Sequence, residues 1–256
     1  MLESVITISK FILFALLAYV VVGLCLYLFQ RTFIYFPVPA VQHEFTEQTF
    51  ENDGEAIRVV AINGDQSDAI LYFGGNAEAV VYSAQPFSEH FPKHAIYLVN
   101  YRGYGGSSGT PTEQAIYSDA LIVFDELNNK HSSISIVGRS LGSAVATFVA
   151  SEREVDRLVL VTPFDSVQAI AQSQFPIYPA QWLVKDKHDS YSRAKNITAP
   201  TLVIVAEYDE VINRKNTMKL IEAFDSRIDV HVIEGAGHNT ISNYSAYFEQ
   251  MTRFIN

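Results

Sequence analysis

The chain has 256 residues and carries 18 basic against 28 acidic side chains, a formal net charge of −10. A nucleic-acid-binding protein normally presents a basic surface, so this charge argues against that class. With 48% hydrophobic and 18% charged residues, the composition excludes a disordered chain. The single cysteine, Cys25, excludes a disulfide framework and a cysteine-based zinc site.

The first segment is apolar enough to cross a membrane. Residues 11–29, FILFALLAYVVVGLCLYLF, contain no charged residue, and a helix of this length rises about 28 Å, close to the roughly 30 Å hydrocarbon core of a bilayer. A signal peptide has a shorter apolar region that ends near small residues, whereas bulky RTFIYFP follows here. We therefore predict a membrane anchor over residues 1–36, with its transmembrane helix at about 11–29 and the lipid bilayer as its partner.

The charges that flank this span give an expected orientation. Lys10 and the amino terminus lie on one side, and Arg31 lies on the other. Because positive charge is retained in the cytoplasm, this distribution favours a cytoplasmic N-terminus. The rest of the single-pass chain is then expected on the non-cytoplasmic side.

After residue 37 the chain alternates strand-like and helix-like segments. Apolar, β-branched runs predict strands at residues 57–62, 69–73, 95–99, 135–137, 157–161, 201–205 and 228–233. Helical stretches between most of them favour crossover connections and a largely parallel sheet. One helix start is indicated by Thr110 as N-cap, Pro111 at the first helical position and Glu113 completing a capping box. The sequence predicts one α/β domain over residues 37–256.

This alternation is interrupted once. Residues 163–199 contain no strand-like run but include several prolines and the aromatic residues Phe175, Tyr178 and Trp182. A long excursion inside an α/β domain is usually functional. We therefore predict a lid over a site, at about residues 165–199.

The strongest chemical motif is Gly138-Arg139-Ser140-Leu141-Gly142. A strand-like segment precedes it and a helix of small residues follows it. A nucleophile on a sharp strand-to-helix turn needs small flanking residues, since larger side chains would clash there. This context predicts Ser140 as a catalytic nucleophile.

A serine nucleophile needs a base, and the base needs an acid to orient it. His238 follows the last predicted strand in VIEGAGHNTIS and is the expected base. Among the other histidines, His131 and His188 are expected at the surface. His90 and His94 straddle a proline, so they cannot share a helical turn as metal ligands would.

Asp209, directly after a buried-looking strand in TLVIVAEYDEVI, is the expected acid. Its neighbours Glu207 and Glu210 could substitute for it, and Asp165 in VTPFDS is a separate competitor. The resulting chain order is Ser140, Asp209, His238, the order found in α/β-hydrolases.

The reaction also needs an oxyanion hole, in which backbone N–H groups face the developing negative charge. We expect one donor at Leu141, directly after the nucleophile. The other donor is expected at Asn76, in the loop that follows the strand ending at Phe73. Gly74 and Gly75 would allow close backbone approach there.

Taken in order, these motifs resemble those of the α/β-hydrolase superfamily, specifically its single-pass membrane-anchored branch, grouped as serine aminopeptidase-like hydrolases. The matching segments are QRTFIYFP, YFGGNA, NYRGYGGSSG, VGRSLGSAVA, TPFDS, VIVAEYDEVI and EGAGHNTI. The resemblance implies an α/β-hydrolase fold with a mostly parallel sheet flanked by helices and a short lid. It also implies a serine hydrolase in which Ser140, Asp209 and His238 are nucleophile, acid and base. Members commonly carry His-Gly-Asn in the oxyanion loop, and here Gly74 stands at the His position.

The sequence thus predicts a membrane-anchored hydrolase of carboxylic esters or thioesters that works through an acyl-enzyme, without metal or organic cofactor. Its expected substrate is a small-molecule or lipid acyl ester. Two alternatives stay open. An aminopeptidase on the same fold would need an acidic anchor for the substrate amine, which Asp186 or Asp189 in the lid could supply. A catalytically inactive scaffold would keep the fold but would not need an intact triad.

Overall fold

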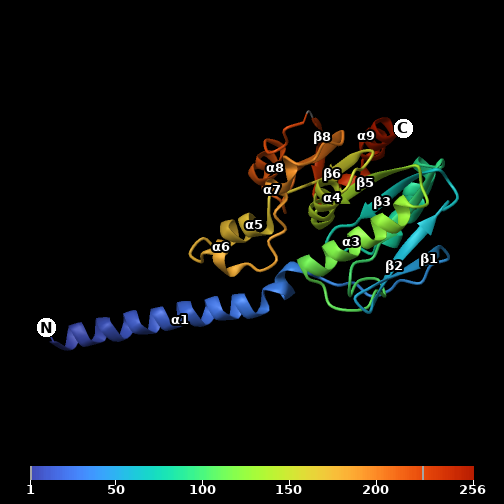
Figure 1. Cartoon of the computed structure of the whole chain (residues 1–256). Helices are drawn as coiled ribbons and strands as arrows, with labels where there is room; N and C mark the ends of the chain where they lie inside the picture. Colours follow the sequence, from blue (N-terminus) through green and yellow to red (C-terminus); the bar gives the residue numbers. More distant parts are fainter. Residues whose placement is uncertain (1, 227) are drawn as a thin grey trace.

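A computed structural model describes residues 2–226 and 228–256 of the chain (Figure 1). Its described strands form one eight-stranded sheet in the order β1-β2-β4-β3-β5-β6-β7-β8. The strands are β1 (Thr46–Asn52), β2 (Glu55–Ile62), β3 (Asp68–Phe73), β4 (His94–Val99), β5 (Ser133–Arg139), β6 (Leu158–Val161), β7 (Thr201–Tyr208) and β8 (Ile228–Gly237). The pairs β1–β2 and β2–β4 are antiparallel, and all other neighbours are parallel. The predicted largely parallel sheet is confirmed.

Helices cover both faces of this sheet. The described helices of the whole chain are α1 (Leu2–Ile34), α2 (Ala84–His90), α3 (Glu113–Asn128), α4 (Leu141–Glu152), α5 (Val167–Gln174), α6 (Ala180–Leu183), α7 (Ser190–Ala194), α8 (Arg214–Ile221) and α9 (Ser245–Ile255). Side chains of α3, α4 and α8 pack on one face, and those of α2 and α9 pack on the other. Alternate residues of β3 pack into the hydrophobic cores on the two faces of the sheet, with Leu71 on the first face and Tyr72 on the second. Burial on both faces explains why the central strands read as continuous apolar runs.

Helix α1 extends away from the rest of the molecule, with the N-terminus at its far end (Figure 1). It extends beyond the apolar run 11–29 at both ends. Within the described residues, α1 is the one helix long and apolar enough to cross a membrane, and its most apolar window is not buried against the rest of the protein.

The segment between β6 and β7 contains α5, α6 and α7. Figure 1 places α5 and α6 beside the C-terminal half of α1, and we refer to residues 167–184 as the lid segment. Helix α7 instead packs against α4, where Ser190 and Ala194 are buried. The excursion therefore meets α1 through the lid segment and through Lys185 and Asp186, which follow it.

Two local expectations differ from the structure. Strand β1 was not expected, because only Phe50 of its sequence TEQTFEN is buried and edge strands lack an apolar pattern. The N-cap of α3 is Thr112 and not Thr110: its side chain accepts a hydrogen bond from the Ala115 N–H at 3.1 Å. Pro111 is buried in the preceding turn, so the helix begins two residues later than the proline suggested.

Candidate active site

Ser140 lies on the turn between β5 and α4, with φ 50° and ψ −115°. Its own N–H donates to the carbonyl of Val161 on β6, and its carbonyl accepts from the hydroxyl of Ser143 at 2.6 Å. Gly142 makes the turn possible, because a Cβ there would stand 2.0 Å from the backbone oxygen of Phe73. A positive φ at a non-glycine residue is strained backbone of the kind that collects at functional sites. This is the strand-turn-helix context that the motif predicts.

His238 follows β8 and lies between Ser140 and Asp209. Its Nε2 is 3.0 Å from the Ser140 Oγ, and its Nδ1 is 2.9 and 3.0 Å from the two Asp209 carboxylate oxygens. The His238 and Asp209 side chains are only 6% and 9% exposed. Because the carboxylate can only accept, Nδ1 carries the proton and Nε2 is left to accept from the Ser140 hydroxyl. The three predicted residues are therefore within hydrogen-bonding distance in the order that acyl transfer requires.

Backbone N–H groups fix the acid in place. Asp209 Oδ1 accepts from the N–H groups of Val211 and Ile212 at 2.9 and 2.6 Å. The neighbouring Glu210 accepts from the backbone N–H of His238 at 3.0 Å, and this hydrogen bond holds the pKa of Glu210 below its usual value. Asp209 thus orients the imidazole ring, while Glu210 holds the loop that carries it.

The competing acids have other partners. Asp165 is buried and pairs with Lys219 Nζ at 2.9 Å, and it accepts from Asn216 Nδ2 at 2.7 Å. Glu207 accepts from the Gly235 N–H at 2.8 Å. Neither carboxylate forms a hydrogen bond with His238 among the residues that the structure describes.

The two expected oxyanion donors lie on either side of Ser140. Leu141 begins α4, and Asn76 follows Gly75, where a Cβ would be 3.7 Å from the Ser140 Cβ. Within residues 2–226 and 228–256, the N–H groups of Leu141 and Asn76 have no acceptor in the chain. Two free N–H groups next to the nucleophile can receive a developing oxyanion.

The Asn76 side chain ties this loop to the end of α1. Its Oδ1 accepts from the Phe36 N–H at 3.0 Å and from the Tyr104 hydroxyl at 2.8 Å, and its Nδ2 donates to the Ile34 carbonyl at 2.7 Å. Gly74, at the position where a histidine is common, lies against Val80, whose Cγ1 would be 2.6 Å from an added Cβ. The space that a side chain would need there is already filled.

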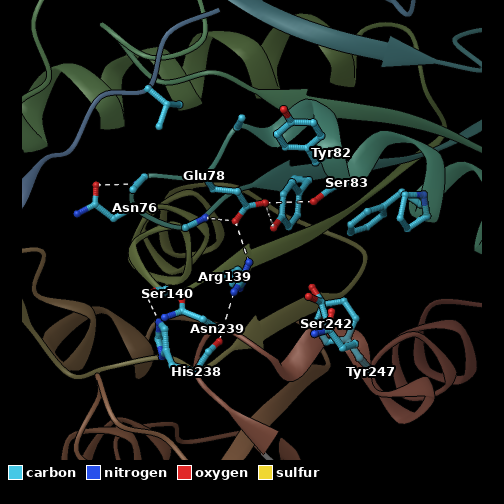
Figure 2. Close-up of a pocket in the computed structure, with 18 of the residues that line it drawn as sticks. Asn76, Glu78, Tyr82, Ser83, Arg139, Ser140, His238, Asn239, Ser242 and Tyr247 are labelled. Carbon is cyan, nitrogen blue, oxygen red and sulfur yellow. Dashed lines mark hydrogen bonds and ion pairs between the residues drawn. The ribbon is translucent and has the colours of Figure 1, made fainter. Parts of the chain in front are cut away.

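Glu78 and Arg139 form a link that the sequence analysis missed. Glu78 accepts from the Gly75 N–H and from the Tyr72 hydroxyl, both at 2.7 Å, and it pairs with Arg139 at 3.3 Å. Arg139 also donates to the backbone carbonyl of His238 at 3.3 Å (Figure 2). Two features of the sequence could have indicated these residues. Arg139 is a variable residue of the motif at residues 138–142, and Glu78 is the glutamate that ends the segment GGNAE.

Two cavities reach Ser140 from different sides. One, of about 750 Å³, also contains Glu78, Arg139 and Asn239 in its lining. The other, of about 360 Å³, lies between α1 and the lid segment, and its lining includes both Ser140 and Asn76. Within the described residues, no cluster of three or more His, Cys, Asp or Glu side chains could hold a metal ion.

Two histidines expected at the surface are buried, so that expectation was wrong. His131 Nε2 is 2.8 Å from the Tyr97 hydroxyl, and His188 lies between the hydroxyls of Tyr35 and Tyr117 at 2.8 and 3.1 Å. The buried environment lowers the pKa of His188 to about 3. Both residues are covered by segments distant in sequence, which local pattern does not reveal.

The lid carboxylates proposed as amine anchors also have partners. Asp186 is 6% exposed and forms an ion pair with Arg31 at 2.8 Å. Asp189 caps α7, where it accepts from the Ser192 N–H at 3.1 Å. Both carboxylates are therefore engaged by groups of the chain itself.

Comparison with solved structures supports the architecture. An esterase of Pyrococcus furiosus matches with a TM-score of 0.70 at 16% identity, over 86% of this chain and 97% of that one. An enol-lactonase of Burkholderia xenovorans matches with a TM-score of 0.65 at 14% identity, over 81% and 99% of the two chains. At these identities the likeness concerns the fold alone.

Sequence comparison identifies the family. An uncharacterized protein of Mycobacterium tuberculosis is 31% identical over 182 residues, which cover 69% of this chain and 65% of that protein. Alpha/beta hydrolase domain-containing protein 17B of Homo sapiens is 29% identical over 164 residues, or 62% and 56% of the two chains. The chain thus covers less than two thirds of the length of these relatives. Residues 96–251 match the family model described as an alpha/beta hydrolase domain, and the chain belongs to the alpha/beta hydrolase family.

Proposed function

We propose that this protein is a membrane-anchored serine hydrolase that cleaves carboxylic ester or thioester bonds. The observation that carries the proposal is the hydrogen-bonded series Ser140–His238–Asp209, with distances of 3.0 and 2.9 Å. The esterase and the enol-lactonase that share the fold are named for reactions at ester bonds, which agrees with this bond class. The apolar helix α1 supports the anchor.

In the first half of the proposed reaction, the Ser140 Oγ attacks the acyl carbonyl carbon while His238 Nε2 takes the hydroxyl proton. The carbonyl oxygen becomes negative and is met by the N–H groups of Leu141 and Asn76. His238 then gives its proton to the leaving alkoxide or thiolate, and the acyl group stays on Ser140. Asp209 remains ionised throughout and stabilises the imidazolium.

In the second half, water takes the place of the alcohol. His238 removes a proton from the water as its oxygen attacks the acyl-enzyme carbonyl. Collapse of the second tetrahedral species breaks the bond to the Ser140 Oγ, which recovers its proton from His238. The products are a carboxylic acid and an alcohol or thiol.

The test is hydrolysis of p-nitrophenyl esters by the full-length protein in detergent, with Ser140→Ala alongside. The full chain is needed because Ile34 and Phe36 hydrogen-bond to Asn76. Loss of the nucleophile of a working triad should lower kcat by several orders of magnitude, about 10⁶-fold in the best-studied case. Equal rates for wild type and variant would rule out the assignment, and a folded wild type inactive on esters and thioesters would favour the scaffold alternative.

A further inference from the structure

The 360 Å³ cavity is built by two parts of the chain that are distant in sequence. Its lining combines the last turns of α1, the lid segment and the nucleophile turn, and includes Leu26, Ile34, Ile170, Leu183, Ser140 and Leu141. Most of the side chains that line it are aliphatic or aromatic. An apolar cavity of this kind, ending at a nucleophile, suits an extended hydrocarbon chain.

The 750 Å³ cavity differs in chemistry. Its lining includes a charged pair and amide and hydroxyl groups, contributed by Glu78, Arg139, Asn239, Ser242 and Asn243 (Figure 2). Ser140 and Asn76 belong to both cavities. A bond held at Ser140 therefore has an apolar side and a polar side, which fits an amphiphilic substrate.

Several polar contacts hold the two walls of the apolar cavity together. Gln30 Nε2 donates to the Leu183 carbonyl at 3.0 Å, and Gln30 Oε1 accepts from the Lys185 N–H at 2.7 Å. Arg31 pairs with the buried carboxylate of Asp186 at 2.8 Å. The cavity is thus part of a built interface that α1 forms with the lid segment and with the two residues that follow it.

The lid segment also contacts α1 well inside its apolar stretch. Tyr178 stacks on Tyr19 with ring centroids 4.7 Å apart, and the Tyr19 hydroxyl donates to the Ile177 carbonyl at 2.9 Å. Tyr19 precedes Phe29, the last residue of the apolar run, by about 15 Å of helix. If α1 spans a bilayer, the contact with Tyr178 lies within it.

The exposed side chains of the lid segment agree with a position inside the bilayer. Ile177 is 69% exposed and Trp182 is 77% exposed. Large apolar side chains exposed together mark a site of interaction with a partner or a membrane. Ile177 contacts Tyr19 of α1, and Trp182 lies on α6, which Figure 1 places beside α1. Since the apolar side chains of α1 are exposed as well, the hydrocarbon of the bilayer is indicated as the medium that surrounds them.

We propose that the cavity between α1 and the lid segment holds the acyl chain of a membrane-resident, long-chain acyl ester, and that this chain enters sideways from the bilayer. The polar remainder of the substrate occupies the 750 Å³ cavity and leaves through it after the first half-reaction. This proposal rests on the proposed function, and it assigns α1 a second role as a wall of the substrate site.

The first experiment narrows the cavity from each wall. Ala171→Trp changes the lid wall and Leu26→Trp changes the α1 wall, since both residues line the cavity. Ser173→Trp and Leu24→Trp are matched controls, because both positions are exposed and outside the cavity. The full-length proteins, reconstituted in phosphatidylcholine vesicles, are assayed with p-nitrophenyl butyrate and palmitate.

We expect both cavity variants to lose at least about tenfold more in kcat/KM for palmitate than for butyrate. The controls should resemble wild type with both esters. Palmitate rates that match wild type in the cavity variants would overturn the acyl-chain site. An equal loss with both esters would also contradict it, since the cavity would then not distinguish the long chain from the short one.

The second experiment uses the only tryptophan of the chain, Trp182, and does not depend on activity. In vesicles that contain lipids brominated on their acyl chains, we expect Trp182 fluorescence to be quenched, with little quenching by aqueous iodide. Quenching by iodide and not by the brominated lipids would exclude sideways access from the bilayer. Absence of Ser140-dependent hydrolysis with normal lipid quenching would instead overturn the proposed function and, with it, the acyl-chain site.

Discussion

Arg139 Nη2 donates a hydrogen bond to the backbone carbonyl of His238 at 3.3 Å, so the residue before Ser140 holds the loop that carries His238. The same guanidinium pairs with Glu78, which accepts from the N–H of Gly75 in the oxyanion loop. Side chains of both members of the pair are less than one fifth exposed. One largely buried ion pair therefore connects the turn of Ser140, the loop of His238 and the loop of Gly75 and Asn76.

We predict that Arg139→Gln lowers kcat by about 10- to 100-fold with little change in KM, because a misplacement of about 1 Å at reacting groups costs about that much. Arg139→Lys should recover part of the loss by restoring the charge. The variants are compared by steady-state kinetics at a temperature where circular dichroism shows them folded. Arg153→Gln, which removes a more exposed pair with Asp125, is the control, and a wild-type kcat in folded Arg139→Gln would contradict the positioning role.

Asp209 and Asp165 provide a matched pair of carboxylates. We predict that Asp209→Asn lowers kcat about 10⁴-fold, as in other triads, because the amide favours the wrong tautomer of His238. Asp165→Asn should leave kcat near wild type and lower the free energy of unfolding, since it removes the ion pair between the buried Asp165 carboxylate and Lys219. Kinetics and urea unfolding of both variants test this, and a large kcat loss confined to Asp165→Asn would reverse the assignment of the acid.

Gly142 and Gly54 differ in what an added methyl group meets. At Gly142 the Cβ would stand 2.0 Å from the Phe73 carbonyl oxygen, whereas at Gly54, with φ +76°, nothing lies within 4 Å. We predict that Gly142→Ala destabilises the protein by several kcal/mol or shifts the nucleophile turn and abolishes activity. Gly54→Ala should cost only about 1–2 kcal/mol of unfolding free energy and leave kcat unchanged. Thermal unfolding and ester hydrolysis, measured together, decide between these effects.

We predict that His188 makes the free energy of unfolding depend on pH. Burial lowers its pKa in the folded protein to about 3, whereas in the unfolded chain it should titrate near the ordinary value of about 6.5. The unfolded state then binds an extra proton between these values. Neutral His188 therefore makes its full contribution to the free energy of unfolding above about pH 6.5. This contribution is lost towards pH 3, at up to about 1.4 kcal/mol per pH unit.

Urea unfolding from pH 7 to pH 4 tests this contribution. His188→Asn should flatten the decline, because asparagine does not titrate there and tolerates the positive φ of this position, 44°. His90→Asn, which changes an exposed histidine, should leave the slope as in wild type. Parallel slopes for wild type and His188→Asn would contradict the assignment.

Direct labelling can test on which side of a membrane the α/β domain, residues 37–256, lies. Cys25, the only native cysteine, is replaced by serine, and a new cysteine is introduced at the exposed position Glu51 of this domain. We predict that a membrane-impermeant maleimide labels Glu51→Cys from the non-cytoplasmic side of sealed vesicles, as the flanking Lys10 and Arg31 indicate. Labelling only after permeabilisation of vesicles with that side outward would invert the topology.

The sequence was most informative where local pattern and chemistry coincide. Ser140 lies between a buried strand and a helix of small residues, and Asp209 and His238 follow the last two strands, so each was predictable from its neighbours along the chain. The central strands β3, β5, β6 and β7 were predictable because burial on both faces of a parallel sheet demands continuous apolar runs. Strand β1 was not, since only Phe50 faces the core.

What could not be predicted depends on contacts between distant segments. The burial of His188 requires Tyr35 and Tyr117 from opposite sides. The link from Glu78 through Arg139 to His238 joins two loops through the end of β5, and no residue spacing along the chain predicts it. The 360 Å³ cavity exists only where α1 and the lid segment lie against each other, although each of these two segments was recognisable in the sequence on its own.

The contacts of the Gln30 and Arg31 side chains with residues 183–186 have a practical consequence for engineering. A foreign transmembrane helix joined at residue 37 would still supply backbone groups near Asn76, but it would remove these two side chains. A graft that keeps residues 26–36 would preserve them. Helix α1 is thus not interchangeable with another apolar helix, and the junction of a chimera decides whether the cavity between α1 and the lid segment is kept.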